Sequence, residues 1–247
     1  TMWLVCSQLQ KWGIPYLIGT KVINPSFVMG RYETEVKDAV ARAIRHGVPE
    51  SFIEKTEGYT GALAIIETDR PGPVTAFRCD MDALPVRESD DPSHLPAKEG
   101  FASERPGVMH ACGHAIHAAV LYGTLLRLSA ERNFEGTLFG IFQPGEESNP
   151  GGASKVLAEN PFEGYTVLAV VGEHVEPALD AGTLGFRAGK YMASNDELRL
   201  TLEGAGGHAA MRAEHRDTVS AAAQLILHLT ALNTPERVVS IGKGEAG

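Results

Sequence analysis

Helical and extended segments alternate in the middle of this sequence, and this alternation constrains the fold more than any other feature. Apolar residues at helical spacing predict helices over residues 114–129 and 152–159. Short apolar runs rich in Val, Leu and Phe predict strands over residues 137–142 and 167–172. Strands that alternate with helices of this length pair in parallel, so the segment predicts an α/β sheet flanked by helices.

Two more strands are expected earlier in the chain, over residues 62–67 and 74–80, with turn residues between them. Helical patterns over residues 2–13 and 33–46 supply covering helices. The polar, Pro-containing stretch 86–106 reads as a long surface loop. The prediction for residues 1–191 is therefore one α/β domain with a mixed, largely parallel sheet.

The pattern changes after Tyr191. Strand-like residues 197–202, a glycine-rich turn at 204–207, a long helix over 218–232 and a further strand over 238–241 follow one another. This order predicts the start of a smaller α+β domain over residues 192–247.

Composition excludes some classes of partner. The formal net charge of −9 argues against non-specific nucleic-acid binding, which depends on Lys and Arg neutralising phosphates. No apolar run approaches the ~20 residues that a membrane-spanning helix needs. We therefore expect a cytoplasmic protein that binds neither nucleic acid nor membranes.

The strongest local motif is MHACGHAIH at residues 109–117. A thiol at Cys112 and an imidazole at His114 can both reach one metal ion, because glycine between them lets the backbone turn tightly. His110 and His117 are further candidates in the same motif. An alternative reading makes Cys112 a nucleophile paired with His114 or His110.

Other candidate side chains follow the predicted strands. Glu146 and Glu147 come after one strand, His174 after the next, and Asp80 and Asp82 after an earlier one. Functional groups in α/β sheets collect beyond the carboxyl ends of strands, so these residues are expected to converge. Asp80 and Asp82 could be ligands or could orient a ligand histidine, whereas a plain Asp-rich turn is the alternative.

With these residues identified, the chain resembles the M20 family of metallopeptidases and amidohydrolases. The resemblance is closest to the branch of aminobenzoyl-glutamate, hippurate and indole-acetyl-amino-acid hydrolases. The matching segments occur in family order over most of the chain: 77–85, 109–117, 142–147 with 151–153, 172–174 and 206–210.

The resemblance implies a role for each matched residue. Cys112, His114, Glu147 and His174 match ligands of two divalent metal ions, Zn or Mn, with Cys112 shared between them. Glu146 matches the general base, and His208 matches a histidine of a ferredoxin-like lid or dimerisation domain that stabilises the oxyanion. The implied reaction is metal-dependent hydrolysis of an N-acyl or N-aroyl amino acid. The implied partner is a second copy or a related subunit bound through the lid.

The sequence departs from the family pattern at several positions. Ala115 stands where relatives carry Asp, and Arg212-Ala213 stands where they often carry a Pro-His pair. A first His-x-x-Pro-Glu segment and a further ligand histidine are not in this sequence, so we expect it to be part of a longer protein. A non-catalytic scaffold subunit with the same fold is the competing interpretation.

Overall fold

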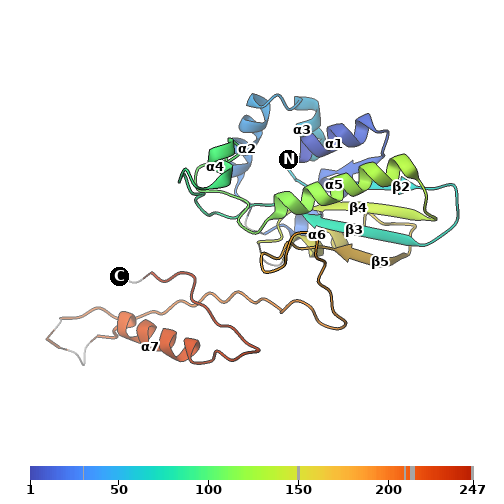
Figure 1. Cartoon of the computed structure of the whole chain (residues 1–247). Coiled ribbons are helices and arrows are strands. Elements are labelled where there is room, and N and C mark those ends of the chain that lie inside the picture. The colour runs from blue at the N-terminus through green and yellow to red at the C-terminus, as the bar shows by residue number, and fades with distance from the viewer. Residues whose placement is uncertain (30, 149–150, 209, 212–214, 246–247) are drawn as a thin grey trace. The chain divides into compact units, whose positions relative to one another are not determined.

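One mixed sheet organises the first part of the molecule (Figure 1). Within the described residues, its strands lie in the order β1-β2-β4-β3-β5. They are β1 (Tyr16–Ile18), β2 (Ala62–Glu67), β3 (Val74–Asp80), β4 (Thr137–Gln143) and β5 (Val167–Gly172). Strand β3 pairs in parallel with β4 and β5, whereas β2 pairs antiparallel with β4 and β1. The mixed sheet flanked by helices is thus confirmed.

Helices cover both faces of this sheet. Helices α1 (Met2–Lys11) and α5 (His114–Glu131) cover one face, and α6 (Gly152–Glu159) covers the other. The first unit also contains α2 (Glu33–Arg45), α3 (Glu50–Thr56) and α4 (Leu95–Glu99), with 3-10 turns at Gly19–Lys21 and Pro25–Phe27. The short helix α4 lies inside the stretch for which the sequence predicts a loop.

The core divides into two clusters, one on each face of β4. Leu9 of α1 and Leu125 of α5 pack with Phe142, while Val156 of α6 packs with Phe139 on the other face. This alternation along β4 is the two-residue period of a strand that is buried on both faces. Helix α5 approaches closely because β4 has glycine at position 140, where an added Cβ would lie 2.7 Å from Leu125 Cδ1.

The structure is a computed structural model that describes all residues except 30, 149–150, 209, 212–214 and 246–247. Ala209, Arg212 and Ala213, which the sequence analysis considered in the family resemblance, therefore lie outside the described residues. The chain divides into two units, Thr1–Phe186 and Arg187–Gly247, and each is described by itself. The domain division at 191/192 stays a prediction.

None of the helices in the described ranges is both long and apolar enough to cross a bilayer.

The second unit contains helix α7 (Thr218–Thr230), whose first turn is capped by the Asp217 carboxylate accepting from Ser220 N at 3.0 Å. The predicted strands over 197–202 and 238–241 were wrong, since the structure assigns no strand there. Leu198 is 78% and Leu200 is 60% exposed, so these apolar side chains of the alternating pattern are mostly in solvent. A strand needs a paired neighbour, and a sequence pattern does not supply one. The α+β lid domain stays a prediction.

Candidate metal centre

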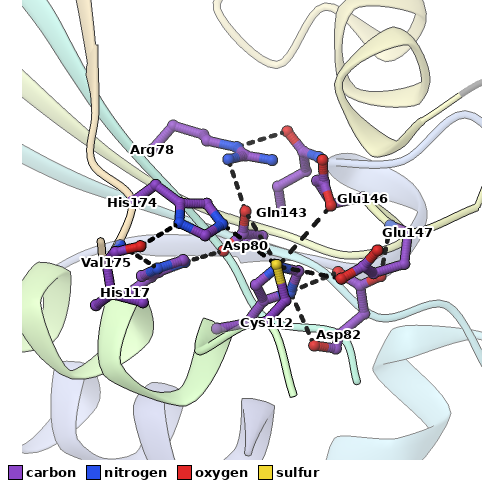
Figure 2. A network of polar contacts seen from close by, with 11 residues as sticks. Arg78, Asp80, Asp82, Cys112, His117, Gln143, Glu146, Glu147, His174 and Val175 are labelled. Atoms are coloured by element: carbon purple, nitrogen blue, oxygen red, sulfur yellow. Dashed lines mark hydrogen bonds and ion pairs between the residues drawn. The ribbon is translucent and has the colours of Figure 1, made fainter. Parts of the chain in front are cut away.

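The candidate side chains meet beyond the carboxyl ends of three neighbouring strands (Figure 2). Asp80 ends β3, Glu146 and Glu147 follow β4, and His174 follows β5. The motif at 109–117 contributes from a fourth direction, because it ends in the first turn of α5. The register sets this meeting point, since Cys79 of β3 lies beside Phe142 of β4, and Phe77 lies beside Val171 of β5.

His114 is the first residue of α5 and is buried. Its Nδ1 lies 2.9 Å from the carbonyl oxygen of Asp82. A carbonyl only accepts, so Nδ1 carries the proton and the lone pair is on Nε2. Among the described residues Nε2 has no hydrogen-bond partner, although buried polar atoms nearly always have one. An unpartnered, unprotonated imidazole nitrogen in such a place suits a metal ion.

Two carboxylates of the loop after β4 face this nitrogen, in addition to Asp80, whose Oδ2 lies 3.6 Å from it. Oε1 of Glu147 lies 3.6 Å from His114 Nε2, and Oε2 of Glu146 lies 3.8 Å from it. Asp82 holds the loop that carries them, because its Oδ2 accepts from the Glu147 backbone N–H at 3.0 Å. The two glutamates differ in exposure, with the Glu146 side chain 43% and the Glu147 side chain 22% exposed.

Cys112 and His174 form a second pair at the site. Cys112 Sγ lies 3.2 Å from His174 Nε2, and His174 Nδ1 donates to the Val175 carbonyl at 2.7 Å. Burial, followed by the nearby Glu147 carboxylate, raises the pKa of the Cys112 thiol to about 11. In the metal-free protein this thiol is therefore protonated at neutral pH, which disfavours Cys112 as a nucleophile.

The donor atoms fall into overlapping groups. Ligand atoms of Cys112, His114 and His174 all lie within 4.8 Å of one another, as do those of His114 with Glu146 and Glu147. One sulfur, two imidazole nitrogens and carboxylate oxygens form a donor set that suits Zn or a similar divalent ion. The residues present thus fit a metal centre in which His114 belongs to both groups of ligand atoms.

A third group, Asp80 with His114 and His117, has the same spacing but a different character. Asp80 and His117 are buried, and their side chains bond to each other at 2.5 Å. Arg78 Nη1 donates to Asp80 Oδ2 at 2.8 Å. Burial alone would raise the pKa of Asp80, but the His117 hydrogen bond and the Arg78 charge hold it below its usual value.

Several residues at the site had no role in the sequence analysis. Arg78 also donates from Nε to Gln143 Oε1 at 2.9 Å, which joins the ends of β3 and β4. Alternate residues of a strand share a face, so the placement of Arg78 two residues before Asp80 could have signalled this pair. Burial raises the pKa of Glu173, whose carboxylate oxygens lack hydrogen-bond partners within the described part of the chain.

Three more residues that the sequence analysis named lie outside these groups of ligand atoms. His110 is exposed and belongs to none of the groups of ligand atoms found among the described residues. Ala115 is exposed on α5. His208 lies in the second unit, is exposed and accepts at Nδ1 from Ala210 N at 3.2 Å. The role of His208 stays a prediction.

Comparison with known proteins assigns the family. The model of peptidase family M20/M25/M40 matches residues 76–246. The chain belongs to this family. M20 membership accounts for the motif order from β3 onward, and it confirms the resemblance seen in the sequence.

Individual M20 relatives are similar along most of this chain. N-acetylcysteine deacetylase of Bacillus subtilis (strain 168) is 40% identical over 195 residues, which are 76% of this chain and 49% of that protein. One subunit of the p-aminobenzoyl-glutamate hydrolase of Escherichia coli (strain K12) is 36% identical over 236 residues, 94% of this chain and 53% of that protein. The chain thus spans about half the length of the curated relatives it matches.

A solved structure gives the same family fold. The Bacillus subtilis YXEP protein, described as a dinuclear metal binding peptidase from the M20 family, matches with a TM-score of 0.50 and 31% identity. The match covers 72% of this chain and 37% of that one.

Proposed function

We propose that this M20 chain carries the metal centre of an amidohydrolase that cleaves the amide bond of an N-acyl or N-aroyl amino acid. The observation that carries the proposal is the buried Nε2 of His114, which faces the carboxylates of Glu146 and Glu147 and has no hydrogen-bond partner among the described residues. The names of the relatives support the reaction class, since they include a deacetylase and one subunit of an aminobenzoyl-glutamate hydrolase.

Cys112, His114, Glu147 and His174 are the residues that would hold two divalent ions, Zn or Mn. The donor set and the dinuclear description of the M20 neighbour support this assignment. Bound ions would supply Lewis-acid polarisation of the scissile carbonyl and make water a better nucleophile at neutral pH. Cys112 contacts His174 on one side and the Glu147 carboxylate on the other, so it is the residue we assign to both ions.

Glu146 is the general base in this proposal. Of the two adjacent carboxylates it is the more exposed, and the loop is held through Glu147 rather than through Glu146. Glu146 can therefore take a proton from the attacking water and pass it to the leaving amine. His208 would stabilise the oxyanion, and residues 192–247 would pair with a second copy or a related subunit.

The test compares wild-type protein with Glu146→Gln on a panel of N-acetyl, N-benzoyl and aminobenzoyl amino acids. Glu146→Gln should keep its metal content, measured by elemental analysis, and lose at least ~10²-fold in kcat, as removal of a general base does. Asp90→Asn is a matched control, because this exposed carboxylate pairs only locally with Arg87. Unchanged turnover in Glu146→Gln would remove Glu146 from the mechanism. A wild-type protein that holds metal and hydrolyses no member of the panel would favour the scaffold interpretation.

A further inference from the structure

His117 has no nitrogen left for a metal ion. The side chain is fully buried on α5, and its Nε2 accepts from the backbone N–H of Val175 at 3.0 Å. A backbone N–H only donates, so Nε2 is unprotonated and the ring proton is on Nδ1. Nδ1 donates it to Asp80 Oδ1 at 2.5 Å. Both nitrogens are therefore committed, and the spacing of Asp80, His114 and His117 does not make a metal site.

The Asp80 end of this pair is anchored in the sheet. Its second carboxylate oxygen accepts from Arg78, and Arg78 is itself bonded to Gln143 at the end of β4. Asp80 is thus held by Arg78 of its own strand β3, which Gln143 of β4 holds in turn, and it presents Oδ1 to α5 from this anchored position.

The Val175 end leads to His174. Val175 donates to His117 through its backbone N–H and accepts from His174 Nδ1 through its backbone carbonyl. The second bond places the His174 proton on Nδ1 and leaves Nε2 unprotonated, 3.2 Å from Cys112 Sγ. The side chain of Val175 packs over Gly113, where an added Cβ would lie 2.5 Å from Val175 Cγ2. Figure 2 shows this chain of contacts from Arg78 to His174.

The segment after β5 needs such an anchor. In the described part of the chain β5 pairs with β3 alone, and Leu168, Val170 and Val171 are each more than half exposed. Packing of β5 therefore does little to fix the direction in which residues 173–175 leave the sheet. A hydrogen bond to a fully buried ring on α5 supplies that direction.

We propose that His117 is a positioning residue: bonded to Asp80, it holds the backbone of Val175 at its N–H, and the Val175 carbonyl in turn fixes the ring orientation and tautomer of His174. The inference rests on the proposed function only for what His174 binds. Groups that hold a ligand histidine in this way typically contribute 10–100-fold to metal affinity.

Three variants separate this role from general stabilisation. His117→Leu removes donor and acceptor, His117→Gln keeps an amide donor and a carbonyl acceptor, and Leu121→Ala removes core packing one turn further along α5. In a competition titration with Zn²⁺, His117→Leu should bind about 10–100-fold more weakly than wild type, and His117→Gln should recover most of that loss. Leu121→Ala should lower the melting temperature and leave zinc affinity within about threefold of wild type. Equal affinity in His117→Leu and wild type, or equal losses in His117→Leu and Leu121→Ala, would overturn the proposal.

A second measurement needs neither metal nor the variants. Imidazole ¹⁵N–¹H correlation spectra of the metal-free wild-type protein should show His117 protonated at Nδ1 alone, and His174 likewise. A proton on Nε2 of His117 would overturn the positioning role even if zinc affinity changed as expected. Conversely, a wild-type protein with these tautomers that binds no zinc would contradict the proposed function and leave the positioning role standing.

Discussion

The two sides of the candidate metal centre are held in different ways. On the buried side, Asp80 and His117 are at most 1% exposed and every side-chain nitrogen and oxygen is hydrogen-bonded. On the open side, Cys112 is half-buried, and Glu146 and His174 are exposed. The difference indicates that the buried side positions groups, while the open side is accessible to the ion and the substrate of the proposed function.

Removing one carboxylate from each side tests most sharply whether the two sides differ in their contribution to stability. Asp80→Ala should lower the free energy of unfolding by about 3 kcal/mol, because it leaves Arg78 and the buried His117 Nδ1–H without their acceptor. Glu146→Ala should change it by less than about 0.5 kcal/mol, since Glu146 is a surface residue outside the core.

Guanidinium unfolding of the metal-free proteins, followed by tryptophan fluorescence, measures both effects. The two tryptophans, Trp3 and Trp12, pack against the core of the first unit, so the signal reports that unit. Similar losses in the two variants would mean that the two sides are equally structural.

A smaller effect concerns the reactivity of Cys112 on the open side. Its raised pKa, about 11, means that the thiolate fraction near pH 8 is far below that of an ordinary thiol with a pKa of ~8.5. Metal-free protein should therefore react with iodoacetamide at least about tenfold more slowly than a free cysteine at pH 8, and faster as pH rises toward 10. Cys6 and Cys79 are buried, so labelling located by mass spectrometry should fall on Cys112. Fast labelling at pH 7 would instead favour the nucleophile reading of Cys112.

Much of the fold could be predicted because short apolar runs bounded by turn residues leave few alternatives. Strands β4 and β5 begin where the sequence placed them, and β4 extends one residue further, to Gln143. The same reasoning predicted a strand over residues 197–202 that the structure does not contain, because alternation specifies which face is apolar but not which strand pairs with it. Helix α4 was missed because it is a single five-residue turn that starts beside Pro96 within a polar stretch.

The residues of the site also differ in how far the sequence alone predicts them. Cys112 and His114 are recognisable from local spacing, and the strand-end residues from the expected α/β topology. The sequence could not predict that His117 is buried and His110 exposed. Both lie in one motif, and only the tertiary structure buries one of them. His117 depends on Asp80, which is 37 residues away and reaches it only through the position of β3 next to α5.

The central claim is that Cys112 and its neighbours bind a metal, and cobalt substitution tests it most directly. With Co²⁺, wild-type protein should show a thiolate charge-transfer band in the near ultraviolet that saturates at about two ions per chain. Cys6→Ser, a matched change at a buried cysteine of the core, should keep this band, and Cys112→Ser should lose it. A band that persists in Cys112→Ser, or a wild-type protein that binds no cobalt, would contradict the account.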